Sequence, residues 1–426
     1  MRNSEYFKNK KITIVGLARS GVACANLLHK LGAFVSITDI KDDAQVRQAC
    51  AKLCSDKIKV ELGAHNRDLI KQADLVVISP GVPSDSLCVN WAREFNKLLV
   101  SEIEVASILC PAQIIAVTGS NGKTTVTTLI GKVLAAAGKK VFVCGNIGNP
   151  FCGEVEKMQM DDFVVLEVSS FQLETIKDFK PRIAVILNLT PNHLDRYNNL
   201  QEYLDAKKRI FMNQDENDFL VLNADDPIFS AVGSSAKSEV VFFTKEKGLN
   251  PNQSAVMAVA RILGIELVQI QKVFQEFMGI QHRLEQVAEI NGVKFINDSK
   301  ATTADSAIWA LSNITPPIIL IAGGRHKGID YRVILEAAKG KVLQAFLIGE
   351  AKDIIASDLK SGGFLIEKVD TLKDAVTKAY AQAKPGYSVL LSPMCSSYDM
   401  FTDYEERGRV FKEIVLDLAR EAKVHG

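Results

Sequence analysis

Short apolar runs alternate with segments of helical periodicity along most of the chain. In the first third the runs are ITIVGL at 12–17, FVSITDI at 34–40 and ADLVVISPGVP at 73–83. A glycine turn and a helical segment near 22–30 follow the first run. Because strands that alternate with helices pair in parallel through right-handed crossovers, this region predicts a Rossmann-like α/β domain.

A second set of apolar runs begins after residue 101. Its members are QIIAVT (113–118), KVFVCG (140–145), DFVVLEV (162–168), RIAVILNL (182–189) and DFLVLNADD (218–226). Near-continuous apolar strands of this kind are typical of a parallel sheet that is covered on both faces. Helices are expected at 126–137, which ends before Gly138, and over most of 252–277.

A third set of runs occupies the last third of the chain. The runs are VKFIND (293–298), PIILIAGG (317–324), QAFLIG (344–349) and YSVLLSP (387–393), and helical patterns lie at 334–338, 371–383 and 405–419. The whole pattern predicts an α/β protein of three domains. We expect an N-terminal Rossmann-like domain at 1–101, a central mononucleotide-binding parallel sheet at 102–280 and a C-terminal Rossmann-like domain at 281–426.

Composition and charge exclude several classes of protein. Among 426 residues, 51 Lys and Arg nearly balance 50 Asp and Glu, which argues against nucleic acid as the main partner. No apolar run approaches the length of about 18–20 residues that a membrane span needs, and MRNSEYFKNKK lacks the apolar core of a signal peptide. The eight cysteines are scattered without a CxxC pair, which is typical of a reducing cytoplasm. We therefore expect a cytoplasmic monomer.

The strongest local motif is TGSNGKTT at 118–125, between a predicted strand and a predicted helix. Glycines let backbone N–H groups converge on phosphate oxygens, the helix N-terminus attracts anions, and Lys123 adds a positive charge. Thr124 directly follows that lysine and can place its hydroxyl on Mg²⁺. Val117 stands where the GxxxxGK[ST] pattern has its first glycine. The alternative is an ordinary strand–turn–helix connection.

Two further groups of polar residues follow predicted strands. Glu167 closes FVVLE and would face the carboxyl edge of the sheet, where open α/β folds bind ligands, so it is the best metal candidate. The segment 188–197 brings His193 together with an aspartate and an arginine just after another strand. Taken singly, a surface carboxylate and a packed histidine are the alternatives.

The glycine turn GLARSG at 16–21 forms a degenerate dinucleotide fingerprint with Asp39 at the end of the next strand. Ala18 replaces the second glycine of that fingerprint. A tight turn that only packs a helix onto the sheet is the alternative.

Several segments, in this order along the chain, resemble the Mur ligase family, the ATP-dependent amide-bond ligases of peptidoglycan synthesis. They are TGSNGKTT (118–125), EVSSFQLE (167–174), LTPNHLDRY (189–197), QHRLE (281–285), NDSKATT (297–303), AGGRHKGIDY (322–331) and LLSPMCSSYDMFTDYEERG (390–408). The last two are similar to segments of the member that adds D-glutamate. The Asp-Asn-Pro run of the member that adds a diamino acid does not occur.

The resemblance implies an activity and its ligands. ATP would phosphorylate the carboxylate of UDP-N-acetylmuramoyl-L-alanine, and the amine of D-glutamate would attack the acyl phosphate and release phosphate. Phosphorylation is needed because a free carboxylate is a poor acylating group. Catalysis then rests on positioning and on charge neutralisation by cations and two Mg²⁺ ions.

The resemblance also assigns residues to the nucleotide and the metals. The phosphates would contact Gly119, Ser120, Asn121, Gly122, Lys123, Thr124 and Thr125. One Mg²⁺ would be bound by Thr124 and Glu167, and the second by His193 and a carbamylated Lys207. From the residues alone, Lys207 and its neighbour Lys208 read as two solvated lysines on a helix. The catalytic groups would be Lys123, His193, Lys207, Arg283 and Lys300.

Other positions are assigned in the same way. Asn252 would contact adenine, Asp298 the ribose, and Arg283 and Lys300 the phosphates from the third domain, which implies a closing motion. The UDP substrate would contact Arg19, Ser20, Asp39, Lys41, Ser79, Gly81, Asn146, Ser169 and Gln172. D-Glutamate would contact Thr302, Lys327, Ser397, Tyr398 and Tyr404.

The chain departs from the family pattern at Asn192, where an acidic residue is usual, and at Ala255, where a second asparagine is usual. Three other functions remain open on the residues alone. Another Mur-type or folylpolyglutamate-type ligase would share the phosphate loop. An NAD(P)-dependent oxidoreductase leaves Glu167 and His193 without a joint purpose, and a nucleotide-dependent switch leaves the C-terminal cations unexplained.

Overall fold

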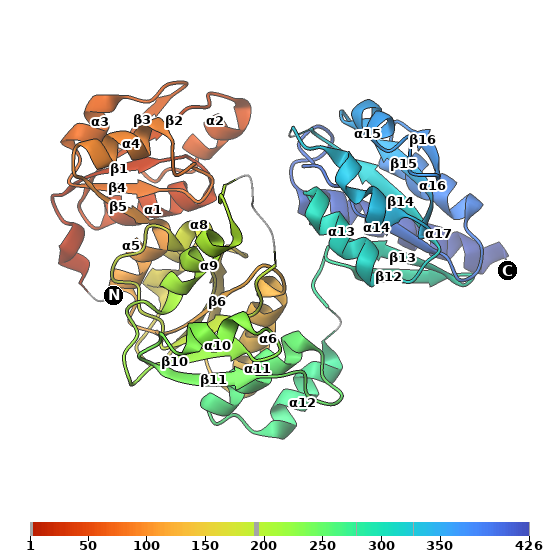
Figure 1. Ribbon diagram of the computed structural model, residues 1–426. Helices are drawn as coiled ribbons and strands as arrows, with labels where there is room; N and C mark the ends of the chain where they lie inside the picture. Colours follow the sequence, from red (N-terminus) through yellow and green to blue (C-terminus); the bar gives the residue numbers. More distant parts are fainter. Residues whose placement is uncertain (1–2, 191–195, 278, 327, 426) are drawn as a thin grey trace. The chain divides into compact units, whose positions relative to one another are not determined.

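The computed structural model describes residues 3–190, 196–277, 279–326 and 328–425. His193 and Lys327 therefore lie outside the described residues. The chain divides into two compact units, Met1–Phe277 and Met278–Gly426. Within the described residues the named strands form three sheets, called here the first, central and third sheet; the first and central sheets belong to the first unit (Figure 1).

The first sheet is parallel throughout, in the order β3-β2-β1-β4-β5, as strand–helix alternation predicts. Its strands are β1 (Lys11–Val15), β2 (Phe34–Asp39), β3 (Lys59–Leu62), β4 (Leu75–Ile78) and β5 (Leu98–Ser101). Its helices are α1 (Arg19–Lys30), α2 (Ala44–Cys50), α3 (Arg67–Gln72), α4 (Leu87–Glu94) and α5 (Glu102–Leu109), after the 3-10 turn Ser4–Phe7. The edge strands β3 and β5 are only partly buried, which explains why their apolar pattern is weak.

The central sheet is also parallel, in the order β11-β10-β9-β6-β8-β7. Its strands are β6 (Gln113–Thr118), β7 (Val141–Gly145), β8 (Phe163–Glu167), β9 (Ile183–Ile186), β10 (Phe219–Asn223) and β11 (Glu239–Phe243). The helices are α6 (Lys123–Ala136), α7 (Phe151–Glu154), α8 (Ser170–Leu173), α9 (Leu200–Lys208), α10 (Ile228–Gly233), α11 (Pro251–Ile262) and α12 (Leu267–Glu276), with 3-10 turns at Val155–Lys157 and Arg209–Phe211. The mostly helical stretch expected at 252–277 consists of α11 and α12, and Gly264 between them has φ +65°.

The third sheet has the order β12-β13-β17-β14-β15-β16. Its strands are β12 (Glu285–Ile290), β13 (Val293–Asn297), β14 (Ile318–Gly323), β15 (Val342–Ile348), β16 (Leu365–Lys368) and β17 (Ser388–Leu391). β12 pairs antiparallel with β13, and the other pairs are parallel. Its helices are α13 (Ala304–Asn313), α14 (Leu335–Ala338), α15 (Lys352–Asp358), α16 (Leu372–Gln382) and α17 (Tyr404–His425), with a 3-10 turn at Tyr331–Ile334.

Buried side chains join the first and central sheets into one unit. Helices α1, α5 and α7 contribute to a single apolar cluster together with strands of both sheets. The other face of the central sheet is covered by α6, α11 and α12, and the third sheet carries a separate cluster on each face. Among the helices in the described residues, none has the length and apolar character that a bilayer crossing requires.

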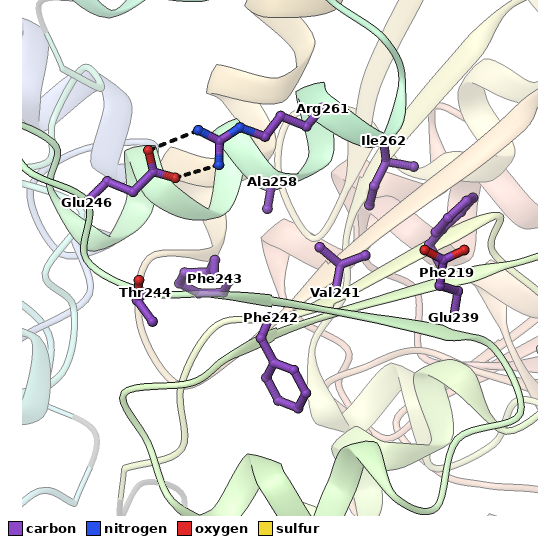
Figure 2. Close-up of a pocket in the computed structure, with 10 residues that line it drawn as sticks. All are labelled: Phe219, Glu239, Val241, Phe242, Phe243, Thr244, Glu246, Ala258, Arg261 and Ile262. Atoms are coloured by element: carbon purple, nitrogen blue, oxygen red, sulfur yellow. Dashed lines mark hydrogen bonds and ion pairs between the residues drawn. The ribbon is translucent and has the colours of Figure 1, made fainter.

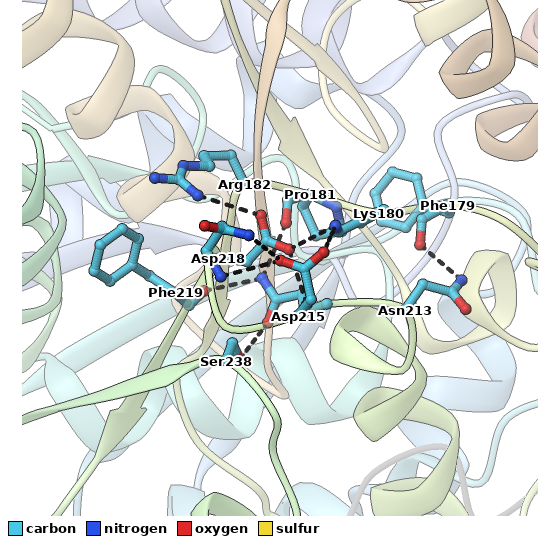
Figure 3. Close-up of polar contacts among 11 residues, drawn as sticks. Phe179, Lys180, Pro181, Arg182, Asn213, Asp215, Asp218, Phe219 and Ser238 are labelled. Carbon is cyan, nitrogen blue, oxygen red and sulfur yellow. Dashed lines mark hydrogen bonds and ion pairs between the residues drawn. The ribbon is translucent and has the colours of Figure 1, made fainter.

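At the amino edge of the central sheet, where β9 and β10 begin, charges meet charges of opposite sign (Figure 3). Lys180 pairs with Asp215 and, at 3.2 Å, with Asp218. The neighbouring Asn213 donates its side-chain amide to the backbone carbonyls of Lys177 (2.8 Å) and Phe179 (3.0 Å). These contacts fasten the chain that leads into β9.

Candidate active site

The segment 118–125 forms a compact loop between β6 and the N-terminus of α6. Helix α6 begins at Lys123, three residues before the expected start, so Lys123 and Thr124 belong to its first turn. The first N–H groups of a helix have no intrahelical carbonyl, which makes this end an anion site. Gly122 has φ +83°, and a Cβ there would lie 2.4 Å from Oδ1 of Asn252. Glycine is therefore required, and Asn252 lies against the loop.

The side chain of Lys123 folds back over this loop. Its Nζ donates to the carbonyls of Gly119 at 2.8 Å and Ser120 at 3.0 Å. The ammonium thus sits at the mouth of the loop, where a phosphate oxygen could replace either carbonyl as its acceptor.

Glu167 lies at the carboxyl end of β8, opposite Val117 of β6, so its carboxylate belongs to the same sheet edge as the loop. It is buried, and Oε1 accepts a hydrogen bond from Asn146 Nδ2 at 2.9 Å. Oε2 has no hydrogen-bond partner among the described residues. A buried anionic oxygen without a partner is costly unless a cation binds it, so Glu167 fits a metal ligand.

Lys207 of α9 is buried, with a side chain in contact with the loop. Its Nζ donates to the Gly119 carbonyl at 3.1 Å and lies 4.1 Å from the centroid of the Tyr203 ring. No carboxylate pairs with it among the described residues. Burial, and the nearby charge of Lys123, lower the pKa of Lys207 well below its usual value. The neutral amine that carbamylation requires is thereby favoured.

The 188–190 segment after β9 is tied to the phosphate loop. The Asn188 side-chain amide accepts from Asn121 N (2.8 Å) and donates to Asn121 O (3.1 Å). Thr190 N donates to Ser120 Oγ at 3.0 Å. The sequence pattern singled out this segment but gave Asn188 and Thr190 no role. His193, which follows, lies outside the described residues.

Arg196 follows His193 by three residues in the sequence. Its side chain contacts two other segments of the chain. It pairs with Glu174 at 2.7 Å and donates to the carbonyl of Val82 at 3.4 Å. It also lies over the Phe171 ring, 4.0 Å from the centroid. The loop after β4, which contains Ser79 and Gly81, is thus connected to the segment that follows β9.

The expected UDP residues cluster at the carboxyl edge of the first sheet. Asp39 accepts hydrogen bonds from Leu17 N (2.7 Å) and Lys41 N (2.9 Å), so its carboxylate holds the glycine turn in place. Ser79 Oγ donates to Gly16 O at 2.9 Å. Gly81 has open space around its Cα, and Arg19, which is exposed next to Ser20, donates to Gly148 O at 2.8 Å.

The residues expected at the muramoyl-alanine end are engaged with one another. Ser169 and Gln172 form a capping box at the start of α8, in which each side chain bonds the other residue's backbone N–H. Asn146 is bonded to Glu167, as described above. These residues lie beside the metal candidate at the end of β8.

In the second unit, the expected ATP residues meet at the carboxyl ends of β13 and β17. Asp298 accepts from Ser392 Oγ at 3.0 Å and from Leu284 N at 3.2 Å. Burial raises the pKa of Asp298 to about 7. Arg283 acts in the opposite direction on that pKa, which places its positive charge close by. Lys300 Nζ lies 5.8 Å from the centroid of the Tyr404 ring.

Of the residues expected for D-glutamate, Thr302 follows β13, Ser397 and Tyr398 follow β17, and Tyr404 is the first residue of α17. Thr302 lies two residues after Lys300. Ser397 is buried and Tyr398 is exposed, whereas Lys327 lies outside the described residues. The sequence pattern gave no role to Arg407, which ties these loops together. Its buried guanidinium donates to the carbonyls of Ser299 (2.8 Å) and Cys395 (3.2 Å), and burial lowers its pKa to about 10.

Two cavities lie away from the phosphate loop. One, of about 420 Å³, opens between β11 and α11 on the outer strand of the central sheet, where Arg261 and Glu246 pair at 2.7 and 3.0 Å (Figure 2). The other, of about 470 Å³, lies between α4 and α9 next to Arg196. Neither cavity is lined by an expected substrate or metal residue. The candidate site is therefore formed by the loops described above and by neither cavity.

Family models match the chain from near its start. Residues 10–101 match the Mur ligase MurD-like N-terminal domain, residues 117–281 the Mur ligase middle domain, and residues 282–395 the Mur ligase glutamate ligase domain. The expected three-domain α/β fold is confirmed. The exact boundaries at 101 and 280 stay predictions.

Curated relatives match over almost their whole length. A UDP-N-acetylmuramoylalanine–D-glutamate ligase from Geotalea uraniireducens is 43% identical, with 96% of this chain and 98% of the relative covered. The protein of the same name from Thermoanaerobacter sp. is 40% identical, with 97% and 99% covered.

Solved structures share the fold at low identity. The UDP-N-acetylmuramate–alanine ligase MurC from Thermotoga maritima has a TM-score of 0.59 and 21% identity, covering 96% of this chain and 100% of its own. MurF from the same organism, in complex with ADP, has a TM-score of 0.56 and 16% identity, with 98% of each chain covered. With domain models along the chain and relatives about 40% identical from end to end, the protein belongs to the Mur ligase family.

Proposed function

We propose that this protein joins D-glutamate to UDP-N-acetylmuramoyl-L-alanine with hydrolysis of ATP to ADP and phosphate, in the synthesis of peptidoglycan precursors. The observation that carries the proposal is the end-to-end similarity to relatives that are named for this reaction. The phosphate loop, the Glu167 carboxylate, whose Oε2 has no hydrogen-bond partner among the described residues, and the buried amine of Lys207 support it independently.

The reaction consists of two substitutions. A carboxylate oxygen of the alanyl group attacks the terminal phosphorus of ATP, and ADP leaves. The amine nitrogen of D-glutamate then attacks the acyl carbon. The bond between that carbon and the phosphate oxygen breaks, phosphate leaves with the bonding electrons, and the nitrogen loses a proton. Lys123 and the first N–H groups of α6 stabilise the negative charge of the transferring phosphoryl group, because they are fixed beside it before the reaction.

Mg²⁺ would neutralise phosphate charge when bound. Thr124 and Glu167 would hold one ion, since both are buried at the carboxyl edge of the central sheet. His193 and a carbamylated Lys207 would hold the second. Carbamylation replaces a buried cation by an anionic oxygen ligand, which suits a position whose pKa already disfavours the charged amine.

The N-terminal and C-terminal parts of the chain would each bind different substrates. The turn around Gly16, held by Asp39 and Ser79, would take the UDP group. Thr302, Lys327, Ser397, Tyr398 and Tyr404 would take D-glutamate, a dianion that needs cations and hydroxyl groups. Arg283, Asp298 and Lys300 would contact ATP. These assignments stay predictions for each residue.

The test measures phosphate release by the purified protein with ATP, Mg²⁺, UDP-N-acetylmuramoyl-L-alanine and one amino acid at a time. We expect release only with D-glutamate, together with a product heavier than the UDP substrate by one glutamyl residue. Release that requires a diamino acid or L-alanine would assign the protein to another Mur ligase reaction, and release without any amino acid would contradict a ligase.

A further inference from the structure

Beyond the contacts that hold ATP, the structure shows how the phosphate loop is held in place. Strands β6 and β9 pair in parallel up to Thr118 and Ile186. Just beyond that point the backbone hydrogen bond from Leu187 N to Thr118 O, at 3.1 Å, still joins the two chains, and a side chain then adds to the pairing. Asn188 uses its amide oxygen and nitrogen to bond the N–H and the carbonyl of Asn121, at 2.8 and 3.1 Å.

A primary amide carries a carbonyl acceptor and N–H donors, so it can bond both the N–H and the carbonyl of one residue, as a strand partner does, where the two chains diverge. The Asn188 carbonyl accepts from Ser120 N at 3.1 Å and strengthens the same junction. Because both polar backbone groups of Asn121 are engaged, the peptide planes that lead into α6 are restricted to one orientation. The N–H groups that follow are therefore preorganised for an anion.

Thr190 extends this junction along the chain. Ser120 Oγ donates to Thr190 O at 3.0 Å, and Thr190 N donates to the same Oγ at 3.0 Å. Asn121 Nδ2 also donates to Thr190 Oγ1 at 3.3 Å. The chain that leaves this junction reaches His193 three residues later. The phosphate loop and the start of the His193 segment are thus bonded to each other directly.

We propose that Asn188 and Thr190 are positioning residues that couple the phosphate loop to the chain at 188–190 after β9, so that the loop and its Mg²⁺ candidate Thr124 keep one orientation toward the phosphates of ATP. The inference rests on the proposed function for the identity of the nucleotide and the metal. Neither side chain needs to touch ATP, because each acts through Ser120 or Asn121.

The decisive variant is Asn188→Ala, with Asn213→Ala as its matched control. Both replacements remove an asparagine that fastens a loop of the central domain by two side-chain hydrogen bonds, but Asn213 bonds the carbonyls of Lys177 and Phe179 at the opposite edge of the sheet (Figure 3). Both are expected to lower the melting temperature. Only Asn188→Ala is expected to change the use of ATP and Mg²⁺.

For Asn188→Ala we expect the KM for ATP and the Mg²⁺ concentration at half-maximal rate to rise by about 10- to 100-fold, as for groups that orient metal ligands. The KM for the UDP substrate should stay unchanged. Calorimetric titration of the protein with ATP in the presence of Mg²⁺ should show the same weakening of ATP binding, in the absence of turnover. Equal changes in all constants, or the same changes in Asn213→Ala, would overturn the proposal.

A milder pair of variants covers the case in which Asn188→Ala does not fold. Thr190→Val removes the acceptor for Asn121 Nδ2, whereas Thr190→Ser retains a hydroxyl at that position. We expect Thr190→Val to raise the Mg²⁺ requirement and Thr190→Ser to restore it, and identical behaviour of the two would contradict the coupling. Should the wild type bind ATP but show no phosphate release dependent on D-glutamate, the proposed function fails while the calorimetric comparison still decides the positioning role.

Discussion

The two edges of the central sheet differ in how far their charged side chains are paired with partners. At the amino edge, Lys180 has two carboxylate partners, and the Lys180 side chain lowers the pKa of Asp215 to about 2 (Figure 3). At the carboxyl edge, Glu167 has an oxygen without a partner among the described residues, and Lys207 is buried with its pKa lowered.

The contrast extends to buried glutamates. Near the amino edge, Glu104 of α5 is buried and accepts backbone N–H groups from Lys177 (2.9 Å), Asp178 (2.8 Å) and Phe179 (3.0 Å). Glu167 is buried to a similar degree but, within the part of the chain that the structure describes, is bonded through only one oxygen. A group that is satisfied stabilises the fold, whereas an unsatisfied one reduces stability and is retained where a ligand completes it. Glu104 thus holds the chain that leads into β9, whereas Glu167 keeps an oxygen that a cation could bind.

The largest effect is expected for Glu167→Gln. Loss of a metal ligand should lower kcat by about 10³-fold, because a bound metal contributes several kcal/mol of charge stabilisation. Without Mg²⁺, the free energy of unfolding should stay equal or rise by about 1 kcal/mol, since a buried charge is removed. Steady-state phosphate release and denaturant titration measure the two quantities.

Glu104→Gln is the matched control for that variant. Its amide would point a donor at backbone N–H groups that now bond a carboxylate, which should destabilise the protein by about 1–3 kcal/mol. Turnover below the unfolding temperature should be unchanged. If Glu167→Gln proved the more destabilising of the two variants, the contrast between the edges would be wrong.

Lys207→Ala should have the next largest effect, a loss of activity of roughly 10- to 100-fold. Short carboxylic acids should partly restore the rate, because a free carboxylate can occupy the space of the carbamate. The neighbouring Lys208 is partly exposed and lies 3.8 Å from Asp205. Lys208→Ala should therefore retain activity, and a fully active Lys207→Ala enzyme would refute the assignment.

The smallest effect is expected for Asp215→Asn at the amino edge. The folded-state pKa of Asp215 is about 2, against a usual value of 3.8, so the carboxylate stabilises the fold above pH 3.8. That contribution is lost as the pH falls from 3.8 toward 2. The stability difference between wild type and variant should accordingly shrink over this range, with phosphate release at neutral pH unchanged. A difference that stays constant down to pH 2 would show that Lys180 does not act through charge.

Much of the fold was predictable because buried parallel strands leave continuous apolar runs, as in 162–168 and 182–189. The edge strands β11 and β16 were missed because each exposes part of its pattern, whereas the edge strand β7 was predicted from its apolar run. The antiparallel β12 was missed for the same reason, as it lies at the edge of the third sheet. Periodicity reports burial, and edges are only half buried.

The residues of the candidate site also differ in whether the sequence predicted them. The phosphate loop is contiguous, so its glycines, Lys123 and Thr124 were predicted from local spacing, and the structure places them at the start of α6. Asn188 and Arg407 received no role, because each acts on backbone groups far away in the sequence. A side chain that bonds a distant carbonyl leaves no periodic or spaced pattern to recognise.

The sequence by itself determined the α/β class, most of the buried strands and the residue types that can bind phosphate. The residues alone did not distinguish the two adjacent lysines, and only the resemblance to the family singled out Lys207; the tertiary structure shows that its side chain contacts the loop. Successive residues on a helix point about 100° apart, and on α9 Lys207 is buried whereas Lys208 stays partly exposed. Lys207 is the buried one because the Gly119 carbonyl, 88 residues away, accepts from its amine, and this contact exists only once β6 and α9 have packed together.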